Sequence, residues 1–326
     1  MNILITGAGS VMGQSIYKAL AMHDFGEPLH VHFANSEEIG AGRFFSLPSA
    51  PVVQAPIFPL AADPGYLEHL ERYVGEHDID IVFSGTQHEL AKISLFRDKT
   101  LKAATISSAI ADICMDKVKT SATLTRHGIR VPFTCTMEDY LASERYVGPI
   151  VVKPNHSSSS RSIFRLESQA EAQRLVGEKT IHPAGFLVQE RLVGEEYTCG
   201  CYVDRYTKQI HNIIFRRTLT PDGATAFGEI IRNPAIEQYV TDVGRALVAE
   251  GMDFGHVNVQ LILTEQGPVL FEINGRLSST EASKAHYGFN SCAAFVSNIV
   301  HQQAYTDWNI ARSGRFLRYY EEIYFD

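Results

Sequence analysis

Two short segments in the C-terminal third carry oxygen-bearing side chains at alternate positions. Asn258 and Gln260 stand two residues apart, and Glu272, Asn274 and Arg276 repeat that spacing. Because alternate residues of a β-strand face one side, two neighbouring strands here would present a row of oxygens that ends in a cation. Such oxygens suit a hard cation such as Mg²⁺, especially one also held by phosphates, and the arginine suits an anion beside it. Taken alone, the pattern fits a half-exposed hairpin with a polar outer face equally well.

A lysine and a serine-rich loop follow an apolar strand in the middle of the chain. Lys153 ends the strand, and Ser157, Ser158, Ser159 and Ser160 lie in the loop. A lysine on a buried strand is costly unless an anion pairs with it. Small residues let backbone N–H groups and hydroxyls close over phosphate oxygens. On its own, the loop is better explained as a solvated turn.

A third block, 187–197, is an apolar strand followed by acidic residues. It contains Gln189 and Glu190, then Leu192 and Glu196 after a short connection. Such a connection offers backbone groups to an adenine edge and an acid to ribose hydroxyls. Alone, a surface acidic turn is the better interpretation.

Together, in this order, the blocks resemble the ATP-grasp superfamily, and the resemblance covers nearly the whole chain. The chain is similar to one synthetase unit of the carbamoyl-phosphate synthase large subunit and to related carboxylate–amine (amino acid) ligases. The segments that carry the resemblance are Gly85-Thr86-Gln87-His88-Glu89-Leu90, Met115-Asp116-Lys117 with Gly128-Ile129-Arg130-Val131-Pro132, Val151-Val152-Lys153-Pro154, Gln189-Glu190, Gly194-Glu195-Glu196-Tyr197, Asn258-Val259-Gln260 and Phe271-Glu272-Ile273-Asn274-Gly275-Arg276.

The resemblance implies a nucleotide site. Lys117 and Lys153 would contact the phosphates of ATP, with Lys153 also near the adenine. Glu190 and Leu192 would line the adenine pocket, Leu192 chiefly through its backbone. Glu196 would bind the ribose.

The resemblance also implies a metal site. Gln260, Glu272 and Asn274 would hold two Mg²⁺ ions, with Mn²⁺ as a substitute, and Glu272 would bridge them. Arg276 would stabilise the transferred phosphoryl group and the acyl phosphate. Gln260 in place of an acidic ligand matches the carbamoyl-phosphate synthase variant of the site rather than that of D-alanine ligase.

Two features depart from the family pattern. The loop at 156–162, with its four serines, would be the lid over the triphosphate, but it lacks the usual glycines: none lies between Gly148 and Gly177. Gly275 also follows the metal-binding asparagine, where family members commonly have proline or serine.

The implied activity is that of an ADP-forming ligase. ATP-grasp enzymes generally phosphorylate a carboxylate to an acyl phosphate, which an amine then attacks. Phosphorylation of bicarbonate or carbamate, as in carbamoyl-phosphate synthase, is one alternative. A nucleotide-binding regulatory protein without turnover is an alternative from another class.

Acceptor specificity is expected in the crevice between the N-terminal and C-terminal parts, from residues 85–89 and 278–290. Lys284 and Arg276 are candidates for holding a substrate carboxylate. A solvated helix position is the more economical interpretation of Lys284.

The N-terminal glycines invite a different interpretation, a dinucleotide site. Gly7, Gly9 and Gly13 miss the Gly-x-Gly-x-x-Gly spacing by one residue, and no clear acid ends the next strand before Glu37. Tight turns are common in parallel sheets, so an NAD site is a minor alternative.

The elements that position these residues alternate between strand and helix at the start of the chain, which favours a parallel sheet. We expect an α/β fold, α+β in its C-terminal part. Residues 1–108 would form a Rossmann-like domain, 109–186 an ATP-grasp lid subdomain and 187–326 the catalytic subdomain. A helical pattern at 111–127 and strands at 256–263 and 269–273 would frame the site.

The composition points to small-molecule partners. The net charge is −8 and no long Lys/Arg run occurs, which argues against nucleic acid or an anionic membrane surface. No apolar run approaches ~18 residues, and the five cysteines form no zinc or disulfide pattern. We expect a cytoplasmic protein that binds a carboxylate and an amine, and a homodimer, which is common in this superfamily.

Overall fold

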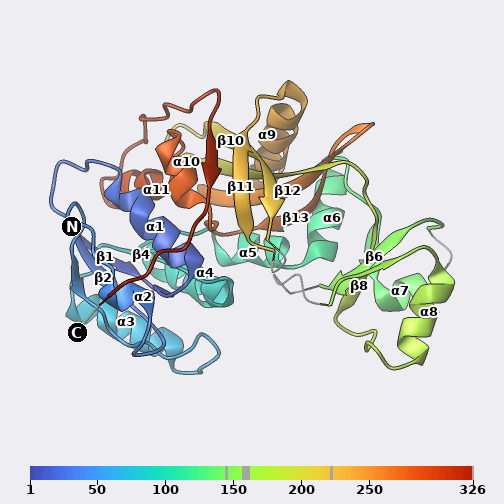
Figure 1. The fold of residues 1–326 in the computed structure, drawn as a ribbon, viewed down its shortest axis with the longest axis horizontal. Helices are drawn as coiled ribbons and strands as arrows, with labels where there is room; N and C mark the ends of the chain where they lie inside the picture. The colour runs from blue at the N-terminus through green and yellow to red at the C-terminus, as the bar shows by residue number, and fades with distance from the viewer. Residues whose placement is uncertain (144–145, 156–161, 221–222, 325–326) are drawn as a thin grey trace.

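The computed structural model describes residues 1–143, 146–155, 162–220 and 223–324. Their strands form one parallel sheet of four strands and two antiparallel sheets of six and four strands. Figure 1 shows the parallel sheet at one end of the molecule, the six-stranded sheet in the middle and the smaller antiparallel sheet at the other end. The expected α/β class with an α+β C-terminal part is confirmed.

The N-terminal sheet consists of short apolar strands that are buried on both faces. Its order is β3-β2-β1-β4. Ile3 and Ile5 of β1 pack into one core cluster, and Leu4 between them packs into another. Helices therefore cover both faces, as a parallel sheet requires. The elements are β1 (Asn2–Ile5), α1 (Val11–Ala21), β2 (His30–Phe33), α2 (Ala41–Phe44), β3 (Val52–Gln54), α3 (Tyr66–Glu76), β4 (Ile81–Phe83), η1 (Gln87–Glu89) and α4 (Leu90–Thr100).

Glycines let the loops after β1 and β4 touch each other. A Cβ on Gly85 would lie 2.1 Å from the Thr6 carbonyl oxygen, and one on Gly13 would lie 2.5 Å from the Gly7 carbonyl oxygen. Because side-chain carbons do not approach backbone that closely, only glycine fits at these positions. Loop packing thus accounts for much of the glycine pattern near the N-terminus.

We expect Gly85→Ala to lower the free energy of unfolding by about 3 kcal/mol, since the added methyl group must displace backbone. Gly75→Ala is the matched control, because nothing lies within 4 Å of a Cβ built there in α3. That change should raise stability by about 0.5–1 kcal/mol. Urea unfolding followed by circular dichroism measures both, and equal stability of the two variants would contradict the close loop packing.

The six-stranded sheet has one apolar face. Cys199, Cys201, Val257 and Val259 are fully buried and pack in one cluster with residues of α5 and α9. The sheet order is β13-β12-β9-β10-β11-β14. Its elements and the helices packed around it are α5 (Ser108–Met115), α6 (Lys117–Arg126), β9 (Glu195–Val203), β10 (Ile210–Leu219), β11 (Thr225–Ile230), α9 (Pro234–Ala249), β12 (Gly255–Thr264), β13 (Gly267–Asn274), α10 (Glu281–His286), α11 (Ser291–Ile299) and β14 (Arg315–Leu317).

The helical pattern at 111–127 forms two helices instead of one. Asp116 separates α5 from α6 in an extended conformation, and its side chain accepts hydrogen bonds from the backbone N–H groups of Val118 and Lys119, at 2.9 Å each. An aspartate that caps a helix in this way stabilises a new start. As a result Lys117 becomes the first residue of α6.

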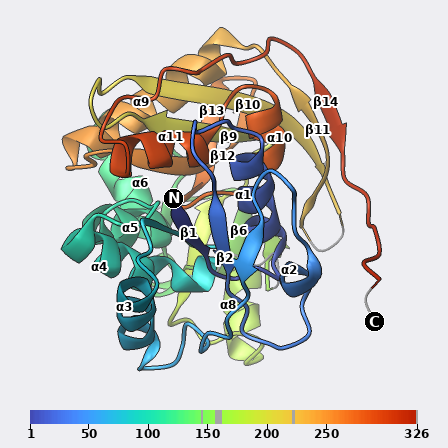
Figure 2. The ribbon, with the colours of Figure 1, turned by 90° about the vertical axis from the view of Figure 1, so that its left-hand side faces the viewer.

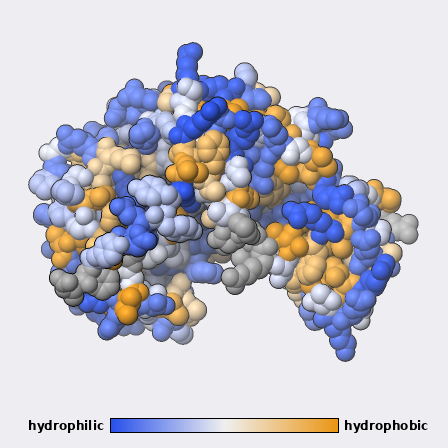
Figure 3. All heavy atoms as spheres, viewed as in Figure 1, coloured by the Kyte–Doolittle hydropathy of each residue, from blue (hydrophilic) through white to orange (hydrophobic). Residues whose placement is uncertain are grey.

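The smaller antiparallel sheet has the order β5-β8-β6-β7 and stands apart from the rest. Figure 3 shows a hollow between this lobe and the main body. A separate apolar cluster, which includes Tyr140, Ile150 and Val188, holds the lobe together. Its elements are β5 (Thr134–Thr136), α7 (Met137–Ala142), β6 (Ile150–Pro154), β7 (Phe164–Leu166), α8 (Gln169–Gly177) and β8 (Phe186–Glu190).

The N-terminal domain contacts the C-terminal part through α1. Figure 2 shows α1 beside α10, and the Ala282 N–H donates to the Ser15 hydroxyl at 2.8 Å. The Asn290 side chain also donates to the Ala19 carbonyl, at 2.9 Å. Helix α1 therefore joins the N-terminal part to α10 and to the start of α11.

The division at 108/109 and 186/187 stays a prediction. Along the chain, β8 runs to Glu190 and pairs with β5 and β6, and α5 and α6 pack on β13.

Within the described ranges, no helix combines the length and the apolar character needed to span a membrane.

Candidate active site

The oxygen-bearing side chains lie on one face of the β12–β13 hairpin. Gln260 pairs with Glu272, and Asn258 pairs with Asn274. Partners in an antiparallel register project to the same side, so these four side chains share a face. Ile273, between Glu272 and Asn274, is 2% exposed and turns into the apolar cluster. The row expected from the alternation is therefore present in the structure.

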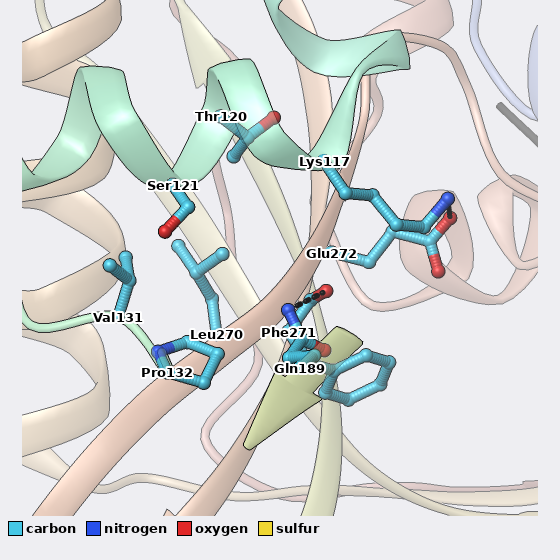
Figure 4. Close-up of a pocket in the computed structure, with 9 residues that line it drawn as sticks. All are labelled: Lys117, Thr120, Ser121, Val131, Pro132, Gln189, Leu270, Phe271 and Glu272. Atoms are coloured by element: carbon cyan, nitrogen blue, oxygen red, sulfur yellow. Dashed lines mark hydrogen bonds and ion pairs between the residues drawn. The ribbon is translucent and has the colours of Figure 1, made fainter. Parts of the chain in front are cut away.

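Lys117 brings a positive charge to this row from α6. Its Nζ lies 3.6 Å from Glu272 Oε1 and donates to the Asn155 carbonyl at 3.1 Å. Figure 4 shows the Lys117 and Glu272 side chains meeting beside a pocket between α6, β8 and β13. The residues lining that pocket are Lys117, Thr120, Ser121, Val131, Pro132, Gln189, Leu270, Phe271 and Glu272.

Lys153 reaches the same place from β6. It is 7% exposed, and its Nζ donates to Gln189 Oε1 at 2.8 Å and to the Phe271 carbonyl at 3.3 Å. Burial lowers the pKa of Lys153 to about 8, while Glu272 opposes this shift and Lys117 adds to it. Among the described residues, Glu272 is the carboxylate that lies beside Lys117 and acts on the pKa of Lys153, and two lysines in this position suit an anionic ligand.

Arg276 joins the row to the N-terminal domain. Its Nε donates to Gln87 Oε1 at 2.6 Å, and its Nη2 donates to Asn274 Oδ1 at 3.3 Å. Burial lowers the pKa of Arg276 to about 10, although Glu272 and Glu281 act in the opposite direction. The arginine therefore remains cationic at neutral pH and holds one oxygen of the proposed metal site.

The candidates for the adenine and ribose lie on the link between the two antiparallel sheets. Glu190 is half-buried at the end of β8 and accepts a hydrogen bond from the Phe133 N–H at 3.2 Å. Leu192 is half-buried in the connection to β9. The Glu196 carboxylate pairs with Arg217 from β10. A ribose at Glu196 would have to share that carboxylate with the arginine.

The four serines of the expected lid, Ser157, Ser158, Ser159 and Ser160, lie outside the described residues. Their proposed contact with phosphates stays a prediction.

A buried charge cluster adjoins the row. The Lys284 Nζ donates to Asn258 Oδ1 at 3.0 Å, to Ser278 Oγ at 3.0 Å and to Glu281 Oε1 at 2.8 Å. Lys284 is fully buried, so its interpretation as a solvated helix residue is wrong. Its three contacts also leave it poorly placed to hold a substrate carboxylate. This burial was not predictable from the local pattern, because the partners of Lys284 lie 3 to 26 positions away in the chain.

His256 belongs to this cluster and is 1% exposed. Its Nδ1 lies 2.8 Å from Ser291 Oγ, and its Nε2 lies 3.6 Å from Glu281 Oε1. Burial lowers the pKa of His256 to about 3, against the pull of Glu281. The ring is therefore neutral at physiological pH and packs inside the protein.

Glu89, from the segment 85–89 considered for acceptor specificity, is occupied within the N-terminal domain. It accepts hydrogen bonds from Thr6 and Tyr66 at 2.7 Å and from Ser84 at 3.0 Å. Gln87, through Arg276, is the member of that segment that faces the site.

Two antiparallel sheets contribute the buried lysines and the oxygen-bearing strand pair, and a parallel sheet precedes them in the chain. A family model described as the ATP-grasp domain matches residues 114–280, just over half of the chain. The chain belongs to the ATP-grasp family, and the resemblance seen in the sequence is confirmed.

Individual relatives are distant. The chain is 25% identical over 247 residues to a phosphoribosylamine–glycine ligase from Streptococcus suis, an alignment that covers 67% of this chain and 59% of that protein. The chain therefore spans little more than half of that relative. Among solved structures, an L-amino acid ligase from Bacillus licheniformis matches with a TM-score of 0.69 at 18% identity, covering 92% of this chain and 74% of that one. A biotin carboxylase from Campylobacter jejuni matches with a TM-score of 0.73 at 12% identity, covering 96% and 74%.

Proposed function

We propose that this protein is an ATP- and Mg²⁺-dependent ligase that joins a small-molecule carboxylate to an amine and releases ADP and phosphate. The observation that carries the proposal is the meeting of Lys117, Lys153 and Glu272 beside the Gln260–Asn274 row. Membership of the ATP-grasp family supports it, as do relatives named as ligases.

The donor set suits Mg²⁺. Glu272 provides a carboxylate and Gln260 and Asn274 provide amide oxygens on one face, and within the described chain no group of three or more His, Cys, Asp or Glu side chains competes as a metal site. One carboxylate with neutral oxygens is a typical set for a cation held largely by substrate phosphates. When bound, the metal would neutralise phosphate charge and orient the triphosphate.

In the proposed reaction a carboxylate oxygen attacks the γ-phosphorus of ATP, the bond to the β–γ bridging oxygen breaks, and ADP leaves. The amine lone pair then attacks the acyl carbon, phosphate departs and the amine loses a proton. No side chain acts as a nucleophile. Lys117 and Lys153 would hold the phosphates, and Arg276 would balance the charge of the transferred group.

The direct test is ADP release from ATP in the presence of carboxylates and amines, supplied singly and in pairs, with bicarbonate as an additional acid. We expect ADP and phosphate in equal amounts only when an acid and an amine are both present. ADP formation with bicarbonate alone would favour carbamoyl-phosphate-type chemistry. ATP binding without turnover across the panel would contradict the ligase proposal.

We expect ATP affinity to fall as the pH rises above about 8, the pKa to which burial lowers Lys153. A phosphate contact would raise that pKa, so ATP binding would take up a proton and weaken by up to tenfold per pH unit once the free lysine is neutral. Titration calorimetry in buffers of different ionisation heats measures the proton uptake. Lys153→Met should remove the pH dependence, whereas Lys99→Met, at an exposed lysine, should keep it.

A cytoplasmic location is part of the proposal. Four cysteines, Cys114, Cys199, Cys201 and Cys292, are buried and form no disulfide within the described residues, and burial raises the pKa of Cys114 and Cys201 to about 12. Buried, unreactive thiols agree with a reducing compartment.

A further inference from the structure

Gln87 follows the strand of the parallel sheet at which the direction of the chain reverses. In the order β3-β2-β1-β4, the chain leaves β1 toward β2 and β3 and later returns to the other side of β1 as β4. The carboxyl ends of β1 and β4 therefore form the topological switch point, the place at which open α/β sheets bind ligands. Gln87 begins η1, directly after the loop that follows β4.

The loop that carries Gln87 is fixed at both ends. The Gly85 carbonyl, before it, accepts a hydrogen bond from the Ser10 hydroxyl of the loop after β1 at 2.6 Å. Glu89, after it, accepts the three hydrogen bonds from Thr6, Tyr66 and Ser84 described above. A side chain that must meet a ligand in one geometry requires such a rigid support.

The contact with Arg276 fixes the orientation of the Gln87 amide. A guanidinium nitrogen can only donate, so the atom 2.6 Å from Arg276 Nε is the amide oxygen, Oε1. The amide nitrogen, Nε2, has no hydrogen-bond partner among the described residues. Gln87 is only half-buried, and its Nε2 is not among the buried polar atoms that lack a partner. Its two N–H groups are therefore accessible to a ligand.

The Gln87 amide borders the space beside Arg276. The oxygen and nitrogen of one amide are closer together than a hydrogen bond is long, so Gln87 Nε2 lies within about 5 Å of Arg276 Nε. Arg276 also donates through Nη2 to Asn274 Oδ1, in the proposed metal row, at 3.3 Å. A group held by Arg276 next to that row is thus within reach of a hydrogen bond from Gln87.

We propose that Gln87 donates a hydrogen bond to the acyl oxygen of the first substrate, the carboxylate oxygen that is not phosphorylated. The proposal rests on the ligase function proposed above and adds the residue that recognises the acyl group. When the amine attacks the acyl carbon, the carbonyl electron pair moves onto this oxygen. The pair returns as the bond to phosphate breaks and the amine proton is lost to water. A donor at this oxygen stabilises the charge that develops between these two events.

The test compares two dianions that differ in a carbonyl oxygen, acetyl phosphate and ethyl phosphate. The ratio of their dissociation constants reports the acyl contact and cancels effects of charge that both share. Titration calorimetry at pH 8, with Mg²⁺ and without nucleotide, measures both constants. We expect the wild type to bind acetyl phosphate about fivefold more tightly than ethyl phosphate. Gln87→Glu keeps an oxygen for Arg276 but has no N–H to donate, so it should bind the two equally. Gln87→Met should also lose the preference.

Gln54→Glu is the matched control, because Gln54 is exposed on the opposite edge strand β3 and its Oε1 also accepts a hydrogen bond, from the Tyr73 hydroxyl at 3.2 Å. It should keep the wild-type preference. The proposal is overturned if the wild type does not prefer acetyl phosphate, if Gln54→Glu loses the preference, or if either Gln87 variant keeps it, since Gln87 would then only hold Arg276. A preference that depends on Gln87, in a protein that releases no ADP with any acid and amine, would keep the acyl contact and refute the ligase function instead.

Discussion

Replacing Glu272 with glutamine is expected to lower the rate of ADP formation by about 10³-fold. Glutamine keeps the size of the side chain but removes the only carboxylate of the row formed with Gln260 and Asn274. The metal would lose its charged ligand, and less of the phosphate charge would be neutralised in the transition state. ADP release with saturating ATP, measured across a Mg²⁺ titration, is the appropriate assay.

The same substitution also acts on the two lysines. Glu272 lies 3.6 Å from the Lys117 Nζ and opposes the burial that lowers the pKa of Lys153. Without it, the pKa of Lys153 should fall below about 8, so that the lysine carries less charge at neutral pH. The pH at which ATP binding weakens should therefore move downward in Glu272→Gln. This shift separates an electrostatic role of Glu272 from a purely structural one.

Glu265→Gln is the matched control, because Glu265 lies in the turn of the same hairpin and is exposed. It should retain wild-type turnover and the wild-type pH dependence. Undiminished ADP formation by Glu272→Gln would refute the metal assignment, and equal losses in both variants would point to damage to the hairpin.

The main strands of the site were predictable because their patterns are local. Alternation of polar and apolar residues is enough to place Gln260 and Glu272 on one face, since Val259 and Ile273 must turn the other way into the core. The register was not predictable from the short turn, because a shift between Gln260 and Leu261 places Gln260 opposite Glu272 instead of Phe271.

Contacts made across the fold were not predictable. Arg318 meets Ser279 across 39 residues, and Arg276 meets Gln87 across 189. Nothing in the local pattern of a charged residue tells which distant element will approach it. The short edge strand β14 was missed for a related reason, because its identity as a strand depends on pairing with β11.

Lys284→Met is expected to lower the free energy of unfolding by about 3–5 kcal/mol. The lysine is fully buried and pairs with the buried Glu281 at 2.8 Å. Removing it leaves a buried carboxylate without its counterion and also takes a donor from Asn258 and Ser278. Urea unfolding of the wild type and the variant measures the loss. Lys99→Met is the control, since the Lys99–Glu71 pair is exposed at both ends and should cost less than about 1 kcal/mol.

The pH dependence of this loss identifies its cause. In the wild type, burial raises the pKa of Glu281, but Lys284 and His256 outweigh it and the net pKa is lowered to about 2. The stability that this carboxylate contributes is therefore present above its unfolded pKa, about 4.3, and is lost only as the pH falls toward 2. In Lys284→Met, burial dominates and raises the pKa of Glu281, so the folded variant takes up a proton and gains stability as the pH falls.

The destabilisation should accordingly be smaller at pH 5 than at pH 8, and Glu281→Gln combined with Lys284→Met should recover part of the loss at pH 8 because no buried charge remains. The opposite result is a loss of stability that is equal at both pH values and is not reduced in the double variant. That result would mean that the loss comes from missing packing around the lysine stem and not from the unpaired Glu281 carboxylate. Lys284 also contacts Asn258, which lies opposite Asn274. If the double variant regains stability but not ADP formation, the Lys284–Glu281 pair has a positioning role beside the row of Gln260, Glu272 and Asn274.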